Sequence, residues 1–88
     1  MTFRVAPHVH FRAVHDELVL LDARNDGYFA LNPSGAVVWS VLADGQPPEA
    51  AAASLVAQYA LPPERARADV AAVVDELIGR GLLERIDG

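Results

Sequence analysis

Cysteine is absent from the 88-residue sequence, so the chain forms no disulfide and has no thiol chemistry. A zinc site would then need about four other ligands in tetrahedral geometry. His8 and His10 share one face of an expected strand and His15 is near, but Asp16 and Glu17 are only loosely placed. We therefore expect scattered surface histidines and no metal site.

Lysine is also missing, and the seven arginines are outnumbered by twelve acidic residues, which gives a net charge of −5. Proteins that bind nucleic acid neutralise its phosphates with a basic face, so this charge disfavours a nucleic-acid partner. It either favours a neutral or basic partner or serves only to keep the domain soluble.

No apolar run approaches the ~20 residues that a membrane-spanning helix needs. The first seven residues are not followed by the long apolar stretch of a signal peptide. The sequence is nonetheless 52% hydrophobic, enough for a dense core in a small domain. We expect a single cytoplasmic domain, residues 1–88, with no membrane partner.

The first third of the chain predicts three strands. Apolar and polar residues alternate over 9–14, the period of a half-buried strand, whereas 18–21 are apolar on both faces, as in a middle strand. Turn signals at His15-Asp16 and Asp26-Gly27 separate these runs from a third strand over 28–31. The result is an antiparallel meander whose third strand lies at an edge.

The rest of the chain predicts three helices. Asn32-Pro33 is an N-cap followed by proline at the first helical position, and Gly45 ends that helix. Further helices are expected over about 49–59 and 64–80, the last with an apolar stripe at helical spacing. We expect an α+β, winged-helix-like fold with an N-terminal three-stranded sheet and three helices packed against it.

Residues that could carry catalysis have ordinary structural explanations. The three serines, Ser34, Ser40 and Ser54, fall in helical segments, and none lies in a Gly-x-Ser-x-Gly turn. Asp69, Asp75 and Glu76 could be paired carboxylates, but they lie among arginines on an exposed helix, where surface charge is the simplest interpretation. We expect no enzymatic activity and no cofactor.

The third strand is the feature most suited to binding. Residues 28–31 contain neither lysine nor proline, which would blunt an exposed edge, so an extended peptide can add there. The third helix would form the opposite wall. The alternative is that Phe29, Leu31 and the helical valines simply build the core.

An ordered set of residues resembles the PqqD-like domains over about residues 9–84. It comprises Leu21-Asp22, the run from Asp26 to Pro33, Gly35 to Trp39, Leu42, Asp44-Gly45, Asp69 to Leu77 and Gly81 to Leu83. The resemblance implies a recognition element for ribosomally made, post-translationally modified peptides. In such domains the precursor's leader adds as a strand beside the third strand and lies against the third helix.

Carried over by position, the resemblance implies strand contacts at Tyr28, Phe29, Ala30 and Leu31, and a helix wall drawn from Asp69, Val70, Val73, Val74 and Leu77. A cysteine-free chain of this length is most similar to the separate B proteins of lasso-peptide pathways. This likeness implies three partners: the precursor leader, a separate cysteine protease that removes the leader, and a cyclase that closes the lasso.

Other functions remain open at this point. One is a winged-helix DNA-binding regulator, although the acids of the third helix disfavour it. A second is a PqqD-type chaperone for another modified-peptide or quinone-cofactor pathway. A third is a small enzyme or a structural subunit without a peptide ligand.

Overall fold

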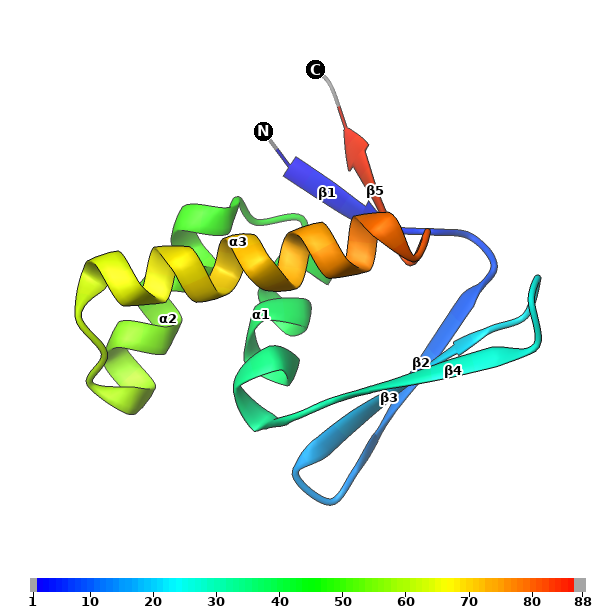
Figure 1. Cartoon of the computed structure of the whole chain (residues 1–88), viewed down its shortest axis with the longest axis horizontal. Helices are drawn as coiled ribbons and strands as arrows, with labels where there is room; N and C mark the ends of the chain where they lie inside the picture. Colours follow the sequence, from blue (N-terminus) through cyan, green and yellow to red (C-terminus); the bar gives the residue numbers. More distant parts are fainter. Residues whose placement is uncertain (1, 87–88) are drawn as a thin grey trace.

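The chain folds into five strands and three helices within residues 2–86, the part that the computed structural model describes (Figure 1). Their bounds are β1 Thr2–Val5, β2 Val9–Val14, β3 Glu17–Asp22, β4 Gly27–Leu31, α1 Pro33–Ala43, α2 Pro48–Tyr59, α3 Pro63–Gly79 and β5 Leu83–Ile86. None of these helices is long and apolar enough to cross a membrane.

Strands β2, β3 and β4 form the expected antiparallel meander, with β3 in the middle and β4 at an edge. The tight turns between them require left-handed backbone, which His15 supplies after β2 (φ 57°) and Asp26 before β4 (φ 55°). The expected order of the three strands, including the edge position of the third, is therefore confirmed.

A second sheet was not expected from the sequence. β1 pairs with β5 in an antiparallel two-stranded sheet that joins the two ends of the chain, with Thr2 opposite Ile86 and Val5 opposite Leu83. Arg4 and Glu84 form an ion pair across it at 2.8 Å. The α+β class is therefore confirmed, but the prediction of a single three-stranded sheet was incomplete. The winged-helix likeness stays a prediction.

Helix α1 begins where its Asn32 cap predicts, and α2 and α3, which have no side-chain cap, begin one residue before the expected positions 49 and 64. The Asn32 side chain accepts a hydrogen bond from the Gly35 N–H at 2.8 Å, which satisfies one of the free amides of the first turn. Proline occupies the first turn of every helix, where its missing N–H costs nothing. The Asn32 cap and Pro33 fix the point at which β4 turns into α1, directly beside the open sheet edge.

The core lies where α1 meets the meander, α2 and α3. Its largest fully buried side chains are Trp39, Leu20, Leu42, Leu55, Leu77 and Val38. Trp39 also makes an edge-to-face contact with Phe11 of β2, with ring centroids 5.4 Å apart. These contacts tie the sheet to the helices.

The strand β2 is more exposed than its alternating pattern predicted. Of its six residues only Val9 is buried, and Phe11 remains 48% exposed despite its contact with Trp39. The reason is visible in Figure 1: the meander extends away from the helices, so much of the face that should be covered has nothing packed on it. The half-buried interpretation of 9–14 was therefore wrong for most of the strand.

Candidate functional site

Within residues 2–86, the outer edge of β4 carries backbone groups without a strand partner. The Ala23 N–H donates to the His8 carbonyl at 2.9 Å, so Ala23 and His8, which continue the register of β3 and β2, are a hydrogen-bonded pair. In an antiparallel sheet, hydrogen-bonded and non-hydrogen-bonded pairs alternate along the two strands. Alternate β3 residues, Leu18, Leu20 and Asp22, therefore bond to β4 through Leu31, Phe29 and Gly27. The N–H and C=O groups of Tyr28 and Ala30 point away from β3, in the plane of the sheet, at its open edge.

A pocket of about 420 Å³ separates this edge from α3. Phe29 and Leu31 face it from the strand, and Ala72 and Val73 face it from the helix. The start of α1 closes one end through Asn32 and Gly35. We call this space, with Glu17 and Glu76 also on its lining, the Val73 pocket.

A second pocket of about 300 Å³ continues along β4 toward the β3–β4 turn. Phe29 belongs to both pockets, and Arg80 and Leu82 form the wall of the second one. We call it the Arg80 pocket, and the two together the β4–α3 groove. The groove thus follows the free strand edge along its whole length, which is the shape an extended peptide requires.

Arg80 is held in place on the wall of the second pocket. Its guanidinium carbon lies 4.3 Å from the centre of the Phe29 ring, and its Nε donates to a Glu76 carboxylate oxygen at 3.0 Å. A stacked, ion-paired arginine keeps its planar group in one orientation. The arginine nevertheless stays half exposed, so it is accessible to a ligand.

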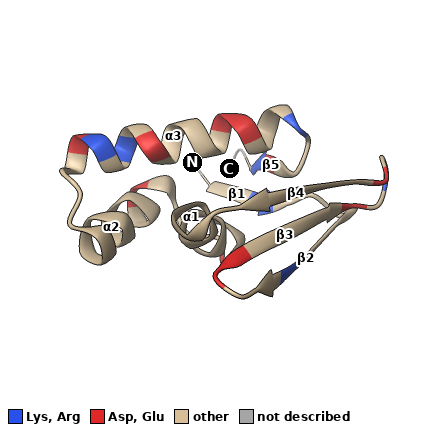
Figure 2. Ribbon diagram, turned by 60° about the horizontal axis from the view of Figure 1, so that its bottom comes forward, with Lys and Arg blue, Asp and Glu red and all other residues tan. Residues whose placement is uncertain are grey.

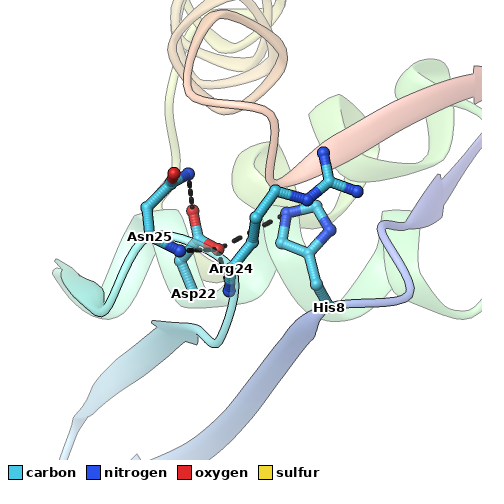
Figure 3. A network of polar contacts seen from close by, with 4 residues as sticks. All are labelled: His8, Asp22, Arg24 and Asn25. Atoms are coloured by element: carbon cyan, nitrogen blue, oxygen red, sulfur yellow. Dashed lines mark hydrogen bonds and ion pairs between the residues drawn. The ribbon is translucent and has the colours of Figure 1, made fainter.

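The turn beside the Arg80 pocket is fixed by a carboxylate (Figure 3). Asp22 accepts hydrogen bonds from the Asn25 side chain at 2.8 Å and from the backbone N–H groups of Arg24 and Asn25. His8 lies 3.5 Å from the same carboxylate. The Asn25 side chain, with the two backbone amides and His8, lowers the pKa of Asp22 despite desolvation.

The predicted strand contacts occupy different faces of β4. Phe29 is half-buried and Leu31 is buried, both on the side of the β4–α3 groove. Ala30 is exposed and also borders the Val73 pocket, and Tyr28, 75% exposed, borders the Arg80 pocket with its side chain on the outer face of the sheet. All four residues remain proposed contacts, and we propose that Tyr28 and Ala30 contact the peptide mainly through their backbone.

The predicted helix wall is divided by the geometry of α3. Val73 lines the groove, whereas Val70, Val74 and Leu77 are buried in the core and support the wall from behind. Asp69 lies one turn before Val73 on the same face, exposed and 3.9 Å from Arg65. It does not line either pocket of the groove.

Sequence reasoning missed Ala72, Glu76 and Arg80 as wall residues. Together with Val73 they recur three, four and seven residues apart, which places them on one helix face. That spacing was readable in the sequence, but only the position of β4 shows that this face borders a groove. Figure 2 shows acidic and basic segments interspersed along the α3 ribbon, with no continuous run of basic residues in that helix.

A different hollow lies on the opposite side of α3. It measures about 280 Å³ and is mostly apolar, with Ala71, Val70 and Val74 on the helix and Ala52 on α2. Phe3 of β1 and Arg85 of β5 also line it, so it borders the two-stranded sheet and not the outer edge of β4. This hollow is a second place where a partner could bind. An experiment on α3 therefore has to distinguish binding in the hollow from binding in the groove.

Metal-ligating side chains do not gather within residues 2–86. No three His, Asp or Glu side chains lie together there as a metal site requires. His8 faces Asp22, whereas His10 is exposed on β2.

Residues 17–83 match the sequence profile of a family described as "Coenzyme PQQ synthesis protein D (PqqD)". The chain belongs to the PqqD family. The matched region includes β3, β4 and all three helices, so every element of the β4–α3 groove lies within the PqqD domain.

Two solved structures each resemble 97% of this chain. One, described as "Lasso peptide synthetase B1 complexed with the leader peptide", has 30% identity and a TM-score of 0.89, and the match covers 97% of this chain and 100% of that one. The other, "TbiB1 in Complex with the TbiA(beta) Leader Peptide", has 27% identity, a TM-score of 0.88 and coverage of 97% and 99%. No curated protein gives a significant match.

Proposed function

We propose that this chain binds the leader of a ribosomally made precursor peptide in the β4–α3 groove. The observation that carries the proposal is the free edge of β4 beside a helical wall. The outward N–H and C=O groups of Tyr28 and Ala30 can pair with an added strand. The two similar structures are described as complexes with leader peptides, which supports the same ligand class here.

The two kinds of contact have separate roles. Main-chain hydrogen bonds to β4 supply affinity that depends little on sequence, whereas the pockets beside Phe29 and Val73 select particular side chains. An unstructured leader loses conformational entropy when it becomes a strand, and apolar burial in the groove offsets this cost. The acidic chain further favours a leader that carries basic residues, mainly by raising the association rate.

In this proposal the chain carries out no reaction of its own. It holds the precursor for a separate cysteine protease that removes the leader, and for a cyclase that closes the product. The likeness to a lasso peptide synthetase B1 along the entire chain supports a lasso pathway. The match to the PqqD profile supports the second candidate, delivery of a peptide in quinone-cofactor synthesis.

A DNA-binding function is less compatible with the structure. The groove-facing side of α3 carries the acidic Glu76, and Asp69 lies on the same face. A helix that enters a DNA groove needs basic and polar side chains there to reach phosphates and base edges.

The placement of the site is tested by Ala72→Gln, with Ala71→Gln as the matched control. Both alanines are exposed on α3, but Ala72 lines the Val73 pocket and Ala71 lines the hollow on the opposite side. A glutamine at 72 would be covered by the peptide with its amide unpaired, so we expect about tenfold weaker binding. Fluorescence anisotropy with a labelled synthetic leader, taken from a short precursor encoded beside this chain, measures both variants.

The control should bind the leader like the unaltered chain. The reverse pattern, weakened binding by Ala71→Gln alone, would move the site to the α2–α3 side and overturn the groove assignment. Far-ultraviolet circular dichroism of both variants checks that the helix is retained.

A further inference from the structure

Arg80 has donors that the fold does not use. Its Nε is bonded to Glu76 and its guanidinium carbon lies over the Phe29 ring, while the two terminal nitrogens have no hydrogen-bond partner within residues 2–86. The carboxylate on the lining of the Arg80 pocket, Asp22, is already bonded to Asn25 and to turn amides. The free donors are therefore held in a fixed position beside the strand edge.

A peptide strand added at β4 would present every second side chain to this position. Neighbouring strands in a sheet place directly opposed side chains on the same face. Residues opposite Tyr28 and Ala30 would point to the outer face, and residues opposite Gly27, Phe29 and Leu31 would point into the groove. Two successive groove-facing residues of the peptide are therefore separated by one residue.

We propose that Arg80 selects a peptide carboxylate, from an Asp or Glu two residues away from an apolar side chain that fills the Val73 pocket. This inference rests on the proposed function and adds a specificity-determining residue to it. A planar guanidinium with two free terminal nitrogens is well suited to a carboxylate, and its stack and ion pair spare the entropy of ordering it.

The lining of the groove also fixes the order of the two side chains. Glu17 and Glu76 line the Val73 pocket, so an acid placed there would meet like charges. Arg80 lines the other pocket, near Gly27 and the β3–β4 turn. The acidic side chain therefore belongs at the Gly27 end of the added strand and the apolar side chain at the Leu31 end.

The test is selection from a displayed library of random 12-residue peptides, carried out with the unaltered chain, Arg80→Gln and Arg80→Glu. We expect the unaltered chain to enrich Asp or Glu at two positions from a large apolar residue. Arg80→Gln should lose this acidic enrichment and keep the apolar one, and Arg80→Glu should enrich Lys or Arg at the same position. Because Arg80 is half exposed, both variants are expected to stay folded, which circular dichroism checks.

One selected peptide then gives the size of the effect. Replacing its acid by the matching amide should weaken binding to the unaltered chain about tenfold, and should change binding to Arg80→Gln little. Enriched peptides without an acid, or equal acidic enrichment by Arg80→Gln, would overturn the role of Arg80 and leave the proposed peptide binding intact. Failure of the unaltered chain to enrich any sequence would overturn peptide binding itself.

Discussion

Ala30→Pro is expected to weaken leader binding by about 10- to 100-fold while leaving the domain folded. The Ala30 N–H points away from β3, so proline removes no hydrogen bond from the meander. It does remove a donor to the added strand, and its ring occupies the space where that strand's carbonyl would lie. Titration of a labelled leader followed by anisotropy measures the loss.

The opposite edge of the meander offers a matched control. Ala13 is an exposed alanine of β2 whose N–H also points out of the sheet, so Ala13→Pro makes the same chemical change at the other edge. It should leave binding unchanged. Equal losses from both variants would mean that proline acts by disturbing the sheet, and a loss from Ala13→Pro alone would place the peptide on β2.

Trp39→Ala is expected to have the largest effect on stability, a loss of about 3–5 kcal/mol. Its side chain is fully buried at the centre of α1 and touches Phe11 of the meander. A small domain has roughly 5–15 kcal/mol in total, so this variant should be close to unfolding at room temperature. Urea denaturation followed by circular dichroism gives the difference.

Trp39→Phe separates packing from hydrogen bonding. The indole Nε1 is buried without a partner within residues 2–86, so phenylalanine gives up volume but no hydrogen bond. We expect it to cost less than half as much as the alanine variant. Similar losses for the two variants would contradict the packing account, because phenylalanine refills much of the volume that alanine leaves empty.

The sequence predicted the meander and the helices because their signals are local. Alternation over β2, the turn at His15 and the Asn32 cap each depend on residues a few positions apart. The sheet of β1 and β5 depends on pairing across the whole chain, such as Thr2 with Ile86. Strands of four residues are too short to show a clear period, so this sheet could not be predicted from local patterns.

The site was predictable in outline and not in detail. The edge position of β4 follows from two tight turns, and the apolar stripe of α3 follows from its spacing. However, the apolar stripe of α3 is wider than the part of the helix that packs into the core. Val73, at one side of the stripe, lines the groove, while Val70 and Leu77 are buried. Which flank is free depends on where the meander packs, and this long-range arrangement leaves no signal in the helix sequence.

The most direct test of the central claim is amide hydrogen exchange by nuclear magnetic resonance, with and without the synthetic leader. Strand addition at β4 predicts that the Tyr28 and Ala30 amides exchange fast in the free protein and become protected when the leader binds. The outward amides of β2, at Phe11 and Ala13, should stay unprotected in both states. Leader binding without protection at Tyr28 and Ala30 would contradict the account.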